Sequence, residues 1–529
     1  MFYMSKTTLP NGIELPTPWP PTGIDMKGTS PQPVPYLDAP PEVIDIRQGR
    51  QLFLDSFLTE PTTLDMTRVY HKAVKYPGNP VFTPTSNEER HPDFAPCAIA
   101  KSGGVWFDDA DDKFKMWYMT GYVGWAAMAV SDDGIHWERP IFDVVPQTNL
   151  ILPKDIHPDS GSVIIDHRAS DPAERYKMLL REPNPPGQGC FAALLFTSPD
   201  GIHWKQVGKT GDMHDRSTMF YDPFTRQWVQ SVRMWHRTAF RCRYFNQHSD
   251  FIQSGVWALD KLNPWLRADH FDSGMYSPPQ VYNFDAIAYE SMMIGFHQML
   301  DGPPNHISEA GGLPKLTELY LSSSRDGYHW HRPDRTPFIG ARREQGSWEY
   351  GYVESSAGMC LIVGDEVWIY YSALAGDPER TNGSAYTSSI YGNGGVGLAK
   401  TRRDGFASMR AMFNGALTQT RKLRFTGSTL YVNANTVGTT LTAAVLGDDY
   451  KALPGFGHDD CVGFLGNSTK VTLRWKHKDL REIGDQNIRL QFRMDRGDLY
   501  AFWITSDPQG KSGGYVGGGG PGFKGGVDQ

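Results

Sequence analysis

The chain has 529 residues, which is enough for a large hydrophobic core and for more than one domain. Its 52 basic and 59 acidic side chains give a net charge of −7, and no Lys/Arg-rich run could follow a phosphate backbone, so no nucleic acid is expected as a partner. No apolar stretch reaches the roughly 18 residues of a membrane span, and the first residues lack a signal-peptide pattern. We therefore expect no membrane partner and a cytoplasmic location, with secretion left open.

The composition favours an all-β chain. Aromatic residues make up 12% of the sequence, and the 55 Gly and 38 Pro indicate short strands joined by many turns. Few segments show the apolar period of an amphipathic helix. The cysteines are scattered without the spacing of a disulfide framework or a zinc site, which favours free buried thiols. They are Cys97, Cys190, Cys242, Cys360 and Cys461.

A short motif recurs along the chain. It reads SDDGIHW at 131–137, SPDGIHW at 198–204 and SRDGYHW at 324–330. Degenerate copies at Asp260 and Asp404 bring the series to five units, with spacings of 67, 60, 66 and 78 residues between their aspartates. Asp can accept hydrogen bonds from the backbone after it, and Gly supplies a positive φ. The repetition therefore predicts that these Asp and His residues hold turns and do not carry out chemistry.

Each unit also contains two β-like segments ahead of its turn. The first of each pair lies at 95–108, 161–166, 217–222, 278–284 and 358–363. The second lies at 111–119, 171–180, 221–232, 290–298 and 363–373. With the turn between a third and a fourth strand, each unit has about four strands, and such units repeated radially form a β-propeller. The fold class predicted is all-β, a five-bladed β-propeller followed by a C-terminal β-sandwich.

The domain boundaries follow from the limits of the repeat. We expect an N-terminal arm at 1–45, a five-bladed propeller with the catalytic site at 46–412, a β-sandwich at 413–507 and a Gly-rich tail at 508–529. The segment 50–74 is expected to supply a strand that closes the ring. The tail is too rich in Gly to fold alone, and it is expected to be either flexible or docked.

A five-unit propeller with turns of the form S-x-D-G-x-x-W, complete in three units and degenerate in two, followed by a β-sandwich, resembles the glycoside hydrolase superfamily that includes families 32 and 43. The resemblance covers about residues 45–505 and implies hydrolysis of glycosidic bonds in furanosidic sugars, of the fructofuranoside or arabinofuranoside type. The Asn-Asp-Pro-Asn-Gly, Arg-Asp-Pro and Glu-Cys motifs of those families are missing. The chain therefore resembles a divergent relative.

Candidate catalytic carboxylates are sought where the innermost strands begin, since those ends converge on the axis of a propeller. Asp93, Asp159 and Asp215 precede the first strands of units one to three, and Glu354 lies in unit five. Acids gathered at one mouth shift one another's pKa, so that one can stay protonated while another is ionised. The resemblance implies Asp93 as nucleophile or base, Asp159 as a tuning residue and Glu354 as the acid, with Asp215 as the alternative acid.

Other residues are candidates for binding sugar, because aromatic rings stack on the C–H faces of sugars and charged groups bind hydroxyls. They are Arg233, Trp235, His236, His297, Trp348 and Glu349. The expected partner is an oligosaccharide or polysaccharide, and a homo-oligomer is left open. No cofactor or metal is expected, and the acidic segment 107–115 is interpreted as a solvated turn. A sialidase-like glycosidase and a non-catalytic carbohydrate-binding propeller remain alternative interpretations.

Overall fold

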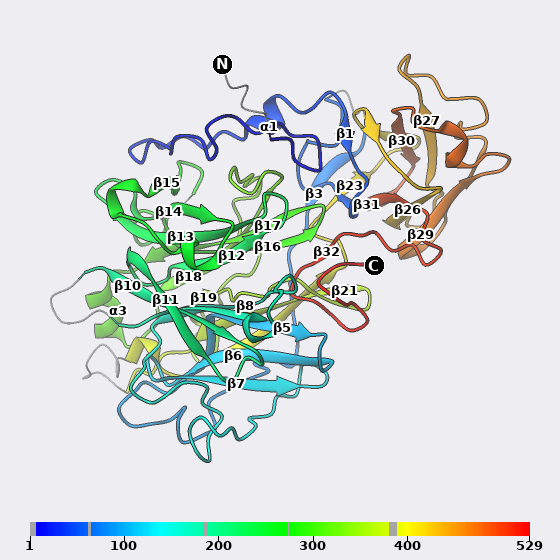
Figure 1. Ribbon diagram of the computed structural model, residues 1–529. Coiled ribbons are helices and arrows are strands. Elements are labelled where there is room, and N and C mark those ends of the chain that lie inside the picture. Colours follow the sequence, from blue (N-terminus) through cyan, green and yellow to red (C-terminus); the bar gives the residue numbers. More distant parts are fainter. Residues whose placement is uncertain (1–6, 62–64, 184–188, 273, 380–388) are drawn as a thin grey trace.

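The computed structural model describes residues 7–61, 65–183, 189–272, 274–379 and 389–529. These residues form β-sheets and connecting loops with a few short helical segments (Figure 1), which confirms the predicted all-β class. The helical segments are α1 (Pro35–Asp38), α2 (Phe251–Ser254), α3 (Asn305–Gly311), η1 (Pro172–Glu174), η2 (Leu259–Lys261), η3 (Ser389–Tyr391) and η4 (Leu480–Ile483).

Five antiparallel sheets follow one another between residues 98 and 402 and are called sheets 1 to 5. Sheet 1 contains β5 (Ala98–Asp108), β6 (Lys113–Thr120) and β7 (Trp125–Ser131). Sheet 2 contains β8 (Ser160–Ile165), β9 (Tyr176–Arg181), β10 (Phe191–Ser198) and β11 (Lys205–Met213). Sheet 3 contains β12 (Thr218–Asp222), β13 (Gln227–His236), β14 (Phe240–His248) and β15 (Asn263–Leu266). Sheet 4 contains β16 (Gln280–Glu290), β17 (Met292–Gly302), β18 (Leu316–Ser324) and the distant β32 (Tyr515–Val516). Sheet 5 contains β19 (Gly351–Glu354), β20 (Leu361–Val363), β21 (Glu366–Leu374), β22 (Gly394–Arg402) and β4 (Val74–Lys75).

The five sheets contact one another in cyclic order. β5 packs against β8, β8 against β12 and β12 against β16, while β18 contacts β19, and β21 and β22 contact β5. The β-like segments read from the sequence overlap the first and second strands of sheets 1 to 4, and β20 and β21 of sheet 5. Val74 pairs with Lys400, so the segment 50–74 does end in a strand at the outer edge of sheet 5, as predicted.

The three complete Asp-Gly motifs form the same hydrogen-bonded turn. In the first, Asp133 Oδ1 accepts hydrogen bonds from the backbone N–H groups of Ile135 and His136, both at 2.8 Å, and Asp133 Oδ2 lies 2.7 Å from His136 Nδ1. The motifs at Asp200 and Asp326 repeat these contacts. Gly134 adopts a φ of 74°, where an L side chain is strained. The predicted structural role of the motif is confirmed.

Each of these turns also joins two neighbouring sheets. Tyr370 of sheet 5 donates to the carbonyl of Gly134 at 2.7 Å, and Trp117 of sheet 1 donates to that of Gly201 at 2.8 Å. Trp265 of sheet 3 likewise donates to the carbonyl of Tyr328, in the turn of sheet 4, at 2.8 Å. An aromatic donor from one sheet thus binds the turn of the next, which explains why the turn sequence recurs.

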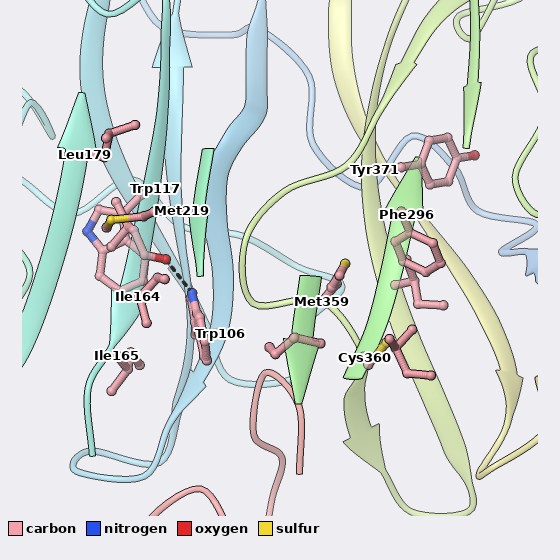
Figure 2. Packing of buried hydrophobic residues seen from close by; sticks show 14 of the residues in the cluster. Trp106, Trp117, Ile164, Ile165, Leu179, Met219, Phe296, Met359, Cys360 and Tyr371 are labelled. Atoms are coloured by element: carbon pink, nitrogen blue, oxygen red, sulfur yellow. Dashed lines mark hydrogen bonds between the residues drawn. The ribbon is translucent and has the colours of Figure 1, made fainter. Parts of the chain in front are cut away.

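Apolar side chains fill the space between the sheets. A continuous core contains residues from all five sheets, and Figure 2 shows part of it around Trp106, Ile164, Phe296 and Tyr371. Trp106 Nε1 donates to the carbonyl of Val163 at 2.8 Å, so its polar atom is satisfied while the ring is buried between sheets 1 and 2. The core therefore couples the sheets through packing as well as through the turns.

The C-terminal part forms further sheets around a separate core. A seven-stranded sheet contains β28 (Cys461–Val462), β29 (Asn467–Trp475), β26 (Thr429–Asn435), β31 (Gly497–Thr505), β23 (Ala407–Ala411), β3 (Thr67–Tyr70) and β2 (Gln51–Leu52). Two smaller sheets contain β24 (Ala416–Gln419), β30 (Arg489–Met494) and β27 (Thr442–Leu446), and β1 (Ile44–Asp45) with β25 (Leu423–Arg424). Leu9, Ile13 and Tyr36 of the N-terminal arm pack into this second core. The domain boundaries proposed from the sequence stay predictions.

The Gly-rich tail is docked, which is one of the two expected alternatives. β32 pairs with the end of β16, and backbone hydrogen bonds join Gly518 to Phe107 and Gly519 to Ile362. The tail therefore binds three sheets at the ends of their inner strands (Figure 1). A side chain has no room at Gly520, because an ideal Cβ there would lie 1.9 Å from the carbonyl oxygen of Ile362.

All five cysteines are free thiols, and four of them are buried, as predicted. Within the described ranges, no helix has both the length and the apolar character needed to cross a bilayer.

Replacing Tyr370 with Phe tests the contribution of the turns to stability. The change leaves the ring in place but removes the donor to the buried Gly134 carbonyl, and we expect a loss of about 1–3 kcal/mol in the free energy of unfolding. Denaturant unfolding followed by tryptophan fluorescence measures the change. Tyr276→Phe, at a half-exposed tyrosine, is the matched control, and equal midpoints for the two variants would contradict a role for this bond.

Replacing Gly520 with Ala tests the docking of the tail. The new methyl group collides with the backbone at Ile362, so we expect trypsin to cleave after Lys511 about tenfold faster or more, because the segment opens more often. Mass spectrometry of the digest follows this cleavage. Gly311→Ala is the control, since a Cβ at Gly311 meets open space. A tail as resistant as that of the parent protein would show that its docking tolerates this clash.

Candidate active site

Nine charged side chains gather where the inner strands of the five sheets begin, at the end opposite the docked tail. This set, called the charged cluster, consists of Lys101, Asp159, Arg181, Asp215, Arg216, Arg233, Arg241, Lys315 and Glu354. Its members lie on β5, β9, β13, β14 and β19 or on the residues just before β8, β12 and β18. Neighbouring sheets in the ring thus each contribute to one group of charges.

Asp159 is paired with a lysine from the adjacent sheet. Lys101 Nζ lies 3.2 Å from Asp159 Oδ1 and 3.1 Å from the hydroxyl of Tyr122. The lysine side chain is almost fully buried, and its ammonium group lies 4.4 Å from the centre of the Tyr122 ring. A buried ammonium needs such partners, because its transfer from water is costly.

Asp215 lies among positive charges. Its Oδ1 is 2.6 Å from Arg233 Nη1, and its side chain is 30% exposed. Burial raises the pKa of Asp215, but the positive charges of Arg233, Lys101, Arg241 and Arg181 outweigh this effect and lower the pKa to about 2. Asp215 is therefore ionised at neutral pH and suited to act as a base or nucleophile.

Glu354 forms the third carboxylate of the cluster from sheet 5. Its Oε1 lies 3.6 Å from Arg216 Nη2 and 3.5 Å from Gln298 Nε2, and Arg216 also donates to Gln298 at 2.8 Å. Both Glu354 and Arg216 are buried. This arrangement holds the carboxylate in a fixed position between sheets 3, 4 and 5.

Tyrosine side chains surround the carboxylates. Tyr391 stacks on Tyr122 with ring centroids 3.8 Å apart and planes at 4°. Burial and the negative charges of Asp159 and Asp215 raise the pKa of Tyr391 to about 12. Burial also raises the pKa values of Tyr282 and Tyr352 well above 10, with contributions from Asp215 and Glu354 respectively. These rings stay neutral and offer hydroxyl groups and aromatic faces beside the acids.

The structure brings together Asp159, Asp215, Glu354 and Arg233 from the predicted site residues. Trp235 adjoins them, with the guanidinium carbon of Arg241 5.4 Å from its ring centroid. Asp93 is placed differently. Its side chain is 77% exposed on the loop before β5, where Oδ2 lies 3.6 Å from His91 Nδ1. In the described part of the chain, no hydrogen bond or ion pair joins Asp93 to the charged cluster.

Glu349 and Trp348 lie at the seam between sheet 5 and its closing strand. Glu349 accepts a hydrogen bond from Tyr371 at 2.7 Å and forms an ion pair with Lys75 at 3.0 Å. Trp348 packs on the Tyr371 ring, with centroids 5.7 Å apart. Both residues therefore stabilise this seam and lie outside the charged cluster.

The two predicted histidines also lie outside the charged cluster. His297 is buried within sheet 4, where its ring lies 4.6 Å from that of Phe284, and burial lowers its pKa well below 6.5. His236 lies at the end of β13, and its Nδ1 accepts a hydrogen bond from Thr238. Burial of His297 removes it from contact with a substrate.

Sequence reasoning missed several members of the cluster. Lys101 had a visible signal, since it is the one lysine in a predominantly apolar strand, and buried lysines need partners. Arg216, Arg241 and Lys315 had no comparable signal, because their approach to the axis depends on contacts between sheets. The same holds for Tyr391, which reaches the cluster from the short helix η3.

The acidic segment 107–115 is more than a solvated turn. Asp108 is buried and forms ion pairs with Lys115 at 2.7 Å and with Arg175 of the neighbouring sheet at 2.7 Å. Its role is thus to join sheets 1 and 2. Across the described residues, no group of three or more His, Cys, Asp or Glu side chains has an arrangement that could hold a metal ion.

No protein-family model matches the chain, and no curated protein matches it. Three solved structures of enzymes that act on sugars are similar in fold. An N-acetylgalactosamine deacetylase from F. plautii, in complex with blood group B trisaccharide, has a TM-score of 0.42 and 14% identity over 65% of this chain and 97% of that chain. A thermostable family-43 glycoside hydrolase has a TM-score of 0.39 and 10% identity over 58% of this chain and 91% of that chain. An exo-β-1,3-galactanase from Phanerochaete chrysosporium has a TM-score of 0.34 and 9% identity over 83% of this chain and 99% of that chain.

Replacing Arg233 with Met tests the origin of the low pKa of Asp215. Removing the guanidinium 2.6 Å away should raise that pKa by about one unit or more, since this charge favours the ionised carboxylate. The ¹³Cγ resonance of Asp215, assigned by its loss in Asp215→Asn, reports the titration. Arg237→Met, at an exposed arginine on the same hairpin, is the control. An unchanged titration in Arg233→Met would show that the other cations suffice.

Proposed function

We propose that the protein is a carbohydrate-active enzyme that hydrolyses glycosidic bonds at the charged cluster. The observation that carries this proposal is that Asp159, Asp215 and Glu354, from different sheets, lie at one end of the ring with tyrosines around them. Glycoside hydrolysis needs one carboxylic acid that protonates the leaving oxygen and one carboxylate that acts as base or nucleophile. In this proposal the five sheets are the blades of a propeller and the C-terminal sheets are a sandwich.

The proposal gives the three acids different roles. Asp215 is kept ionised by Arg233, so it is proposed as the base or nucleophile. Glu354 is held by Arg216 and Gln298 and is proposed as the proton donor. Asp159 and its partner Lys101 are proposed to orient the substrate and to tune the other two acids. This assignment replaces Asp93, which lies exposed on a loop, by Asp215.

The finer points of the function remain part of the proposal. We propose a furanosidic substrate, as the resemblance to families 32 and 43 implies, and a cytoplasmic location, with secretion left open. The alternative is a propeller that binds carbohydrate without catalysis. It differs from the proposal because it requires no proton donor beside the base.

A screen of aryl furanosides, fructans and arabinans with product analysis tests the proposal. On a substrate that the parent protein cleaves, we expect Asp215→Asn and Glu354→Gln to lower kcat by about 100-fold or more, because each removes an acid–base group. Asp93→Asn should leave the rate within about twofold, since surface changes away from a site act weakly.

Three results would contradict the proposal. Full activity in both Asp215→Asn and Glu354→Gln would remove these residues from the chemistry. Loss of activity in Asp93→Asn, with an unchanged melting temperature, would restore the assignment made from the sequence. Binding of oligosaccharides without any cleavage would favour the non-catalytic alternative.

A further inference from the structure

A cavity of about 120 Å³ lies inside the ring, between the inner strands and the docked tail. All five sheets line it, through Trp106 of sheet 1, Ile164 of sheet 2, Met219 of sheet 3, Ala286 of sheet 4 and Ala357 just after the first strand of sheet 5. The side chains of Trp106, Ile164 and Met219 can be seen together in Figure 2. None of the described residues that line the cavity belongs to the charged cluster, so the cavity is separate from that site.

The walls of the cavity are mostly apolar. Further buried side chains that line it are those of Ile165, Phe220, Ile287 and Ala288. Such side chains form no hydrogen bonds, so they hold water weakly and gain from contact with an apolar ligand. A cavity of about 150 Å³ with walls of this kind binds a single benzene ring. The cavity therefore has the size and the lining for one six-membered ring.

One buried carboxylate also lines the cavity. Asp285 of β16 is only 2% exposed. Its Oδ2 accepts hydrogen bonds from the side chains of Asn283 and Ser355, whereas its Oδ1 has no hydrogen-bond partner in the described part of the chain. A buried oxygen without a partner costs free energy, which a ligand that brings a hydrogen-bond donor recovers. The cavity thus favours a ligand with one donor on an apolar body.

Positive charge is already present beside this carboxylate. Burial raises the pKa of Asp285, and the hydroxyl of Ser355 and the guanidinium groups of Arg216 and Arg243 act against this rise. Arg243 reaches the same strand, since its Nη1 donates to the carbonyl of Tyr282 at 3.2 Å. A cationic ligand would be repelled by these guanidinium groups, so a neutral hydroxyl is the donor that fits.

The tail forms one wall of the cavity. It contributes Tyr515, Gly517, Gly525 and Gly526. The N–H of Gly525 donates to Asp109 Oδ2 at 2.6 Å, and a Cβ at Gly526 would lie 2.8 Å from Cδ2 of His167, so the tail fits closely over the sheets here. A ligand in the cavity touches the sheets and the tail at once, and it therefore binds the docked state more tightly than the open state.

We propose that this cavity binds a small neutral molecule with an apolar body the size of one six-membered ring and a hydroxyl group that donates to Asp285 Oδ1. Phenols and cyclic alcohols belong to this class. The site goes beyond the proposed function, because it lies on the tail side of the ring and takes no part in the chemistry at the charged cluster. When occupied, it holds the tail in its docked position.

Calorimetric titration with three matched probes tests the ligand class. Phenol and toluene have nearly the same shape and differ in a hydroxyl against a methyl group, whereas benzylammonium carries a positive charge. We expect phenol to bind about tenfold more tightly than either of the other probes, because only phenol brings a neutral donor to Asp285.

Variants of the lining residues locate the binding. Ala286→Val and Ala288→Val narrow the cavity, and each should weaken phenol binding about tenfold or more. Asp285→Leu should bind phenol and toluene equally. Ala173→Val, at an exposed alanine, is the control and should bind like the parent protein. Thermal unfolding establishes that each variant is folded, and the two alanine variants keep the test valid if Asp285→Leu fails to fold.

Protection of the tail gives an independent readout. Phenol at ten times its Kd should slow tryptic cleavage after Lys511 about tenfold, because the occupied cavity keeps the tail docked. Ala173→Val should show the same protection, whereas Ala288→Val should show little of it. Cleavage at an unchanged rate with phenol bound would overturn the contact between ligand and tail.

The remaining outcomes each decide one part of the proposal. Equal binding of phenol and toluene to the parent protein overturns the role of Asp285, and tighter binding of benzylammonium overturns the neutral class. Failure of all three probes to bind, or binding unaffected by both alanine variants, overturns the site. Neither binding nor tail protection requires cleavage of a glycoside, so these results and those on the proposed function can fail separately.

Discussion

The arrangement of the five sheets depends on one kind of hydrogen bond. A buried aromatic side chain of one sheet donates it to the backbone of the turn in the next sheet. Tyr370, Trp117 and Trp265 each bind a turn carbonyl across a seam between sheets. The turn can present that carbonyl because its Asp side chain satisfies the backbone N–H groups and its Gly adopts a positive φ. The bond fixes the spacing of neighbouring sheets, and this spacing brings the first residues of the inner strands close together. The charged cluster is therefore a consequence of the seams, although no turn residue belongs to it.

Burying the charged cluster costs free energy of folding. The ion pairs within the cluster show how the fold tolerates this cost. Each carboxylate has a cation from another strand or sheet, as in Asp159 with Lys101 and Glu354 with Arg216. Buried ion pairs contribute little net stability, because desolvation offsets the attraction. The cluster is thus better explained by a requirement for function than by a requirement for folding.

The sequence predicted those parts of the fold that depend on residues close together in the chain. The Asp-Gly turns and two strands of each sheet could be predicted, because turn chemistry and apolar runs depend on neighbouring residues. Only part of the charged cluster could be predicted from the sequence. Asp159 directly precedes β8 and Asp215 lies three residues before β12, so the strand start fixes both near the axis. Asp93 is five residues before β5, and the loop between them turns its side chain outward. Lys315 and Arg241 come to the axis through contacts between sheets, which no local pattern records.

The two ends of the ring differ in the kind of interaction that closes them. At one end the tail binds through backbone groups, and glycine is required because Gly518 and Gly520 approach the carbonyls of Gly358 and Ile362 too closely for a side chain. Backbone hydrogen bonds and close packing favour a single fixed arrangement, which suits a structural closure. At the other end, charged and aromatic side chains with surplus hydrogen-bonding capacity surround the axis. Polar groups that are left incompletely satisfied are tolerated where a ligand completes them. The asymmetry between the ends is therefore an independent reason to place substrate binding at the charged cluster and not at the tail.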